Sequence, residues 1–154
     1  STDIAASLGL DDCDIDTILK RLFPEVERRL VEEYSKQGKK TVSDSSSDVL
    51  AVLLSHLDIS DQSHHLTSFW LVRILAARTA LPGHLWIAMG LTERPQLTAA
   101  IQRHLPSLAE ANKQNMRWKR YLYKQVCDLN GGVMCKSPNC GVCSDYHLCF
   151  AVEL

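Results

Sequence analysis

The sequence contains few residues that interrupt regular structure, and it has none of the common catalytic motifs. Its 154 residues include only seven glycines and five prolines, which favours long helices over a sheet with many tight turns. Glycine-rich nucleotide loops, an H-E-x-x-H metal motif and a G-x-S-x-G nucleophile motif are all absent. We therefore expect a helical protein that is not an enzyme.

Long apolar runs and an excess of one charge are also absent. No stretch of about 18 apolar residues could span a membrane, and residues 1–10 lack the basic and apolar regions of a signal peptide. The 17 basic and 18 acidic side chains leave a net charge of -1, which argues against a strongly basic nucleic-acid binder. We expect a cytoplasmic protein that binds neither membranes nor nucleic acids.

Helical periodicity of apolar residues runs through most of the chain. It predicts a helix over about residues 15–38, which Pro24 kinks or breaks near Phe23. Further helices are predicted over about residues 49–57, 63–80, 84–91, 92–106 and 107–127. We predict an all-α single domain, residues 1–154, with five or six helices. Residues 1–127 would form the helical body, and residues 128–154 an irregular, cysteine-rich metal-binding segment.

Charge is unevenly distributed along the chain. The first 16 residues contain five acidic side chains and no basic one, whereas six basic residues and one acid lie between Lys113 and Lys136. This basic stretch is either the solvated face of a helix or a region that attracts an anion, an anionic cluster or an acidic partner. The candidates for anion attraction are Arg117, Lys119, Arg120, Lys124 and Lys136.

Five of the six cysteines lie in the last 28 residues. Four of them have the spacing C-x4-C-x2-C-x5-C, and a fifth precedes this motif by eight residues. The motif residues are Cys135, Cys140, Cys143 and Cys149, and the preceding one is Cys127. Glycine and proline within the segment permit the irregular backbone that lets several thiolates converge on one point.

Three types of site can explain this cysteine motif. Disulfides require an oxidising compartment, for which the chain shows no targeting signal. Structural zinc sites usually pair two C-x2-C units, and only one is present here. The beginning of the motif, C-x4-C-x2-C, matches the spacing of plant-type ferredoxins. The spacing favours an iron–sulfur cluster and leaves the other two alternatives open.

The cysteine motif and the segments before it together resemble the NifQ family of nitrogen-fixation proteins. The resemblance is carried by the motif itself, by Asn115 to Cys127, and by His84-Leu85-Trp86 through Gly90-Leu91, with Arg94 and Leu97 following. It covers about residues 80–150. The tail departs from the family pattern, because Ala151 and Val152 stand where family members usually continue with glycine and proline.

The resemblance implies an iron–sulfur protein that donates molybdenum to assembly of the iron–molybdenum cofactor of nitrogenase. It implies a 4Fe-4S or 3Fe-4S type cluster that can include molybdenum, with the four motif cysteines as presumed ligands and Cys127 as an additional candidate. The implied partners are the cofactor-assembly scaffold, the nitrogenase iron protein, and molybdate or a molybdenum-carrying donor. An iron–sulfur electron-transfer protein and a zinc-stabilised interaction module remain the alternatives.

Two histidines are further candidates for contacts near the metal. His84 lies in the family-like segment beside Trp86, and His147 lies between two motif cysteines. The ordinary expectation for each is a structural histidine; the functional one is a metal contact or a hydrogen-bond donor to a ligand. Cys13, 114 residues before the next cysteine, is expected to be a thiol without a functional role.

Overall fold

The computed structural model describes residues 4–35, 45–58, 60, 65–81 and 83–129, and the structural description below concerns these ranges. They form helices and no strand, which confirms the predicted all-α fold. The helices are α1 (Ile4–Ser7), α2 (Asp12–Leu22), α3 (Arg28–Ser35), α4 (Ser45–Ser55), α5 (His65–Thr79), α6 (Leu85–Ala88), α7 (Arg94–His104), α8 (Pro106–Ala111) and α9 (Trp118–Leu129). None of the helices in these ranges is both long enough and apolar enough to span a bilayer.

The described ranges contain more helices than the five or six that were predicted, because two predicted helices are divided and a short helix that was not predicted, α1, precedes them. The predicted N-terminal helix is interrupted where α2 ends, and Phe23 N–H closes its last turn on the Leu19 carbonyl at 3.0 Å. Pro24 cannot continue the hydrogen-bond pattern of the helix, and the chain becomes helical again only at Arg28. The predicted break near Phe23 is confirmed.

The predicted helix over residues 107–127 is also two helices, α8 and α9. Asn112 caps the end of α8, and Asn115 has a φ of 50°, outside the range of a right-handed helix. The Asn112 side chain forms two hydrogen bonds with the backbone of Met116. An asparagine side chain that bonds to the backbone competes with helix continuation, which explains a break that neither glycine nor proline marks.

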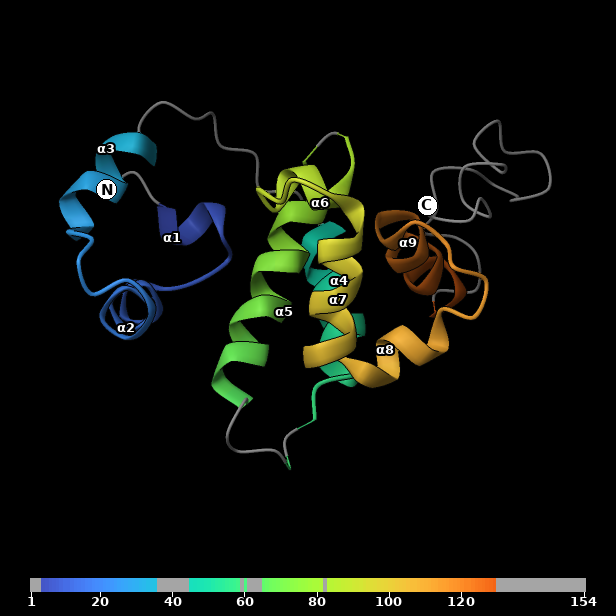
Figure 1. Cartoon of the computed structure of the whole chain (residues 1–154). Helices are drawn as coiled ribbons and strands as arrows, with labels where there is room; N and C mark the ends of the chain where they lie inside the picture. Colours follow the sequence, from blue (N-terminus) through green and yellow to red (C-terminus); the bar gives the residue numbers. More distant parts are fainter. Residues whose placement is uncertain (1–3, 36–44, 59, 61–64, 82, 130–154) are drawn as a thin grey trace.

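The main hydrophobic core lies between α4, α5, α7, α8 and α9 (Figure 1). Its fully buried side chains include Val49, Leu53, Val72, Leu75, Ile101, Leu108 and Leu122. Burying each side chain of this type contributes about 1.5–3 kcal/mol relative to leaving it in water. Through this core α9 packs against α4.

The N-terminal helices α1 and α2 pack against α5 through a second apolar cluster, formed by Ala5, Leu10, Ile15 and Trp70. Two polar contacts accompany it. Trp70 Nε1 donates to an Asp14 carboxylate oxygen at 3.1 Å, and Arg73 Nε donates to the Gly9 carbonyl at 2.6 Å. The N-terminal helices are therefore docked on the helical body by both apolar packing and specific hydrogen bonds.

Candidate functional site

The structure places most of the predicted functional residues of the helical body on α9 or directly before it, and His84 at the start of α6. Arg117 comes directly before α9, and Lys119 and Arg120 lie in its first turn. Lys124 and Cys127 lie further along the same helix. Cys135, Cys140, Cys143, Cys149, His147 and Lys136 lie outside the described residues, so their predicted roles remain predictions.

Cys127 is a buried free thiol in the last turn of α9. It lies beside Val126 in a helix whose inner face belongs to the main core. Within the ranges that the structure describes, no three His, Cys, Asp or Glu side chains are grouped closely enough to hold a metal ion. A metal site that includes Cys127 therefore requires ligands from outside the described ranges.

Lys119 connects the start of α9 to the segment that precedes α6. Its Nζ donates to the carbonyl of Leu81 and, at 3.1 Å, to the carbonyl of Gly83. Burial lowers the pKa of Lys119 from its ordinary value, and the neighbouring positive charge of Arg120 lowers it further. The ammonium group is thus held at a fixed place next to His84, which immediately follows Gly83.

His84 lies within the electrostatic influence of three cationic side chains. It is the N-cap residue of α6, and its ring stacks on Trp86 with the ring centres 6.4 Å apart and the planes at 20°. Burial lowers the pKa of His84, and the positive charges of Arg94, Arg117 and Lys119 lower it further. We refer to His84, Arg94, Arg117 and Lys119 as the cationic cluster.

The cationic side chains of this cluster lack a countercharge in the described ranges. Arg94, Arg117 and Lys119 form no ion pair there with a carboxylate, in contrast to Lys124, whose Nζ lies 2.8 Å from Asp128 Oδ2. The charge of Lys124 is therefore balanced within α9 itself. Within the described ranges, the three cationic side chains of the cluster have no such partner, and both interpretations of the basic stretch remain predictions.

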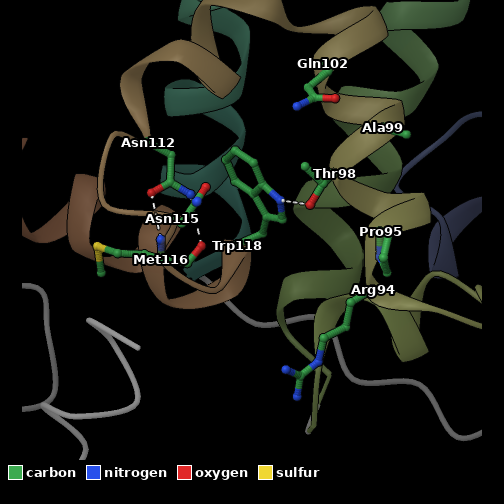
Figure 2. A pocket seen from close by; sticks show the side chains of 9 residues that line it. All are labelled: Arg94, Pro95, Thr98, Ala99, Gln102, Asn112, Asn115, Met116 and Trp118. Atoms are coloured by element: carbon green, nitrogen blue, oxygen red, sulfur yellow. Dashed lines mark hydrogen bonds between the residues drawn. The ribbon is translucent and has the colours of Figure 1, made fainter. Parts of the chain in front are cut away.

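A pocket of about 340 Å³ lies between α7 and the turn that joins α8 to α9 (Figure 2). Its lining residues are Arg94, Pro95, Thr98, Ala99, Gln102, Asn112, Asn115, Met116 and Trp118. Trp118 Nε1 donates to Thr98 Oγ1 at 3.0 Å, which fixes the indole across the pocket. In Figure 2, Arg94 lies at the opposite end of the pocket from Gln102, so this arginine belongs to both the pocket and the cationic cluster.

The sequence analysis identified part of this site. It singled out His84, Arg117 and Lys119, and the structure brings these three together. It gave no functional role to Arg94 or to Trp86. The available signal was that both lie in the segment after Pro82 whose residues resemble the NifQ family.

In the described ranges the protein is all-helical, and a cationic cluster lies at the N-terminal end of α9. In the sequence, α9 is followed by the cysteine-rich segment. The model of the NifQ family matches residues 1–151. The chain belongs to the NifQ family of nitrogen-fixation proteins. The resemblance seen in residues 80–150 is thereby confirmed, and the match extends through the N-terminal helices.

Several similar proteins carry the NifQ name. The chain is 33% identical over 156 aligned positions to Protein NifQ of Azotobacter vinelandii, and the match covers 96% of this chain and 78% of that protein. It is 31% identical to the Protein NifQ homolog of Sinorhizobium fredii, with coverage of 92% and 60%. It is 45% identical over 84 positions to Protein NifQ of Rhodobacter capsulatus, with coverage of 54% and 47%. No solved structure matches the chain.

Proposed function

We propose that this protein is an iron–sulfur protein that binds molybdenum and donates it to assembly of the iron–molybdenum cofactor of nitrogenase. The proposal combines membership of the NifQ family with the chemistry of the cysteine motif. The receiving partners would be the cofactor-assembly scaffold and the nitrogenase iron protein. The protein would act as a carrier in the cytoplasm rather than as a catalyst.

The donor set of the chain suits an iron–sulfur cluster. Thiolates are the usual protein ligands of such clusters, and soft sulfur ligands also suit molybdenum–iron–sulfur chemistry. Cys135, Cys140, Cys143 and Cys149 supply four thiols, and the buried thiol of Cys127 is available at the end of α9. These residues would hold the cluster, which supplies sulfide and iron positions to which molybdenum can bind.

The observation that carries the proposal is the cationic cluster. A molybdenum donor takes up its cargo as an oxyanion or from another carrier, and positive charge raises the local concentration of an anion. Arg94, Arg117 and Lys119 present that charge without a carboxylate partner in the described part of the chain. A purely structural helix surface would more often balance such charges, as Lys124 and Asp128 do.

Anaerobic reconstitution of the full chain tests the proposal. The purified protein is incubated with iron, sulfide and molybdate, freed of unbound ions, and analysed for all three elements and by electron paramagnetic resonance. Iron, sulfide and molybdenum bound together, followed by molybdenum transfer to the assembly scaffold, is the expected result.

Other results would support different functions. Zinc without sulfide would indicate a zinc-stabilised interaction module and end the cluster hypothesis. A reversible one-electron couple without molybdenum binding or transfer would indicate an electron-transfer protein. Replacement of all four motif cysteines by serine is the matched control, and it is expected to abolish binding of iron and sulfide.

A further inference from the structure

Two buried N–H groups at the cationic cluster have no hydrogen-bond partner in the described part of the structure. One belongs to Arg117, a member of the cluster, and the other to Trp86, which stacks on His84. Arg117 Nε and Trp86 Nε1 are inaccessible to solvent and form no hydrogen bond within the described part of the structure. A buried donor that has lost its water and gained no acceptor is unfavourable, and such groups are uncommon in native proteins. Both belong to the surroundings of His84, since Trp86 stacks on its ring and the charge of Arg117 acts on it.

The side-chain charges of the cluster near these two donors are all positive. Arg94 and Arg117 carry positive charge from α7 and from the residue before α9, and Lys119 adds a third. The carbonyls of Leu81 and Gly83 orient the Lys119 ammonium but carry no net charge to neutralise it. Like charges that share a small region repel one another, and a bound anion would remove that repulsion.

We propose that the cationic cluster is a binding site for a tetrahedral oxyanion, molybdate, held by the guanidinium groups of Arg94 and Arg117 and by the indole N–H of Trp86. The inference rests on the proposed function, because it names the form in which the cargo first binds and where. It assigns initial binding to the helical body rather than to the cysteines. Binding involves no redox step, so the metal stays at its highest oxidation state.

The chemistry of the donors favours an oxyanion over other anions. A guanidinium group presents two parallel N–H donors that match two oxygens of an oxyanion, and charge-assisted hydrogen bonds of this kind are the stronger ones. Two arginines balance the two negative charges of molybdate. An aromatic N–H can only donate, which suits a ligand whose outer atoms are all acceptors.

Molybdate binding to a cluster-free chain tests the inference. The full chain with Cys135, Cys140, Cys143 and Cys149 replaced by serine is titrated with sodium molybdate at low ionic strength in a calorimeter. Arg94→Gln and Arg117→Gln are each expected to weaken binding about 10- to 100-fold. Arg103→Gln, which removes an exposed arginine at the far end of α7, is expected to leave the dissociation constant unchanged.

Thermal stability separates a binding role from a structural one. Because Arg117 Nε has no hydrogen-bond partner among the described residues, Arg117→Gln is expected to keep or raise the melting temperature of the ligand-free chain. Molybdate should raise the melting temperature of the unsubstituted chain and have little effect on the variant. A lowered melting temperature together with unchanged molybdate affinity would overturn the inference.

Competing anions identify the occupant. Sulfate and phosphate are titrated into the same cluster-free chain. Weaker binding of both than of molybdate supports the proposal, and equal or tighter binding of either anion would overturn molybdate as the occupant.

The outcomes also distinguish this inference from the proposed function. If molybdate binds through the arginines but the reconstituted protein holds no sulfide, the oxyanion site stands and the cluster-based function fails. If Arg94→Gln and Arg117→Gln chains take up and transfer molybdenum like the unsubstituted protein, the function stands and the oxyanion site fails.

Discussion

The side chain of Asn112 holds both backbone polar groups of Met116. Its Nδ2 donates to the Met116 carbonyl at 2.9 Å, and its Oδ1 accepts from the Met116 N–H at 3.0 Å. Both residues are buried, so this pair replaces the backbone bonds that a continuous helix would have made. It sets the turn that places Arg117 and Lys119 at the start of α9.

We expect Asn112→Ala to destabilise the protein by about 2 kcal/mol, because two buried backbone groups lose their partners. Equilibrium unfolding in urea measures the change. Gln114→Ala, at an exposed position in the same turn, serves as the control and should change stability by less than about 0.5 kcal/mol. Equal effects of the two substitutions would show that the Asn112 pair does not stabilise the turn.

Gly9 and Gly90 have similar φ angles, but they should tolerate substitution by alanine very differently. A Cβ at Gly9, where φ is 67°, would lie 2.9 Å from the Arg73 carbonyl oxygen, whereas a Cβ at Gly90, where φ is 76°, meets no atom within 4 Å. Gly90→Ala should cost about 1–2 kcal/mol from the left-handed backbone alone. Gly9→Ala should cost about 1–3 kcal/mol more, because the helices α1 and α2 must shift on α5. Thermal unfolding of the two variants provides the comparison, and a Gly90→Ala variant at least as unstable as Gly9→Ala would contradict it.

Thr98→Val should destabilise the region around the pocket. The substitution keeps the size of the side chain and removes the hydroxyl that accepts the hydrogen bond from Trp118 Nε1 at 3.0 Å. The expected cost is about 1–3 kcal/mol, since a buried indole N–H is left without an acceptor. Thr67→Val, at an exposed position on α5, controls for the helix propensity of valine. Urea unfolding that shows no difference between these two variants would count against the bond.

Stability should fall as the pH is lowered below neutrality, partly because of His56. Burial lowers the pKa of His56 from 6.5, and its Nδ1 lies 2.9 Å from Ser107 Oγ. The unfolded chain therefore binds a proton more readily than the folded one. The contribution of His56 to stability is complete above pH 6.5 and is lost as the pH falls through the lowered pKa.

His56→Gln should reduce this pH dependence. The free energy of unfolding is measured between pH 5.5 and pH 7.5 for both chains, and the variant should show the shallower slope over that interval. An identical slope for the two chains would mean that other groups account for the acid sensitivity.

The two cysteines of the described helices should differ strongly in reactivity. Cys13 is exposed and Cys127 is buried. In the full chain with the four motif cysteines replaced by serine, we expect a thiol reagent to modify Cys13 at least about 100-fold faster than Cys127, whose reaction requires local opening of the structure. Cys13→Ser and Cys127→Ser assign the two phases, and similar rates would show that Cys127 is accessible in the folded protein.

Local sequence signals predicted a large part of the fold. Pro24 marked the interruption between α2 and α3, and the helix predicted over about residues 84–91 contains α6. The break between α8 and α9 was missed. It depends on the pairing of Asn112 with Met116, for which the sequence shows only an asparagine within an otherwise helical pattern.

The composition of the site was less predictable than the fold. His84 and Lys119 are far apart in the sequence and meet because Lys119 binds the carbonyls of Leu81 and Gly83. Arg94 joins them from the first residue of α7. Spacing along the chain carries no information about such contacts between helices. The sequence therefore identified Arg117 and Lys119, which lie in one basic stretch, but not Arg94 of α7.

The turn between α8 and α9 has an electrostatic consequence for the cationic cluster. Since α9 begins at Trp118, the positive end of its dipole lies beside Lys119 and Arg120, and its first turn contains no acidic residue. Basic side chains at this end of a helix oppose the dipole, at a cost of about 0.3–1 kcal/mol each. A continuous helix over residues 107–127 would have placed them in its interior, where the dipole has little effect. The chain therefore forgoes stability at the start of α9, and salt should strengthen that end of the helix before any specific ligand binds.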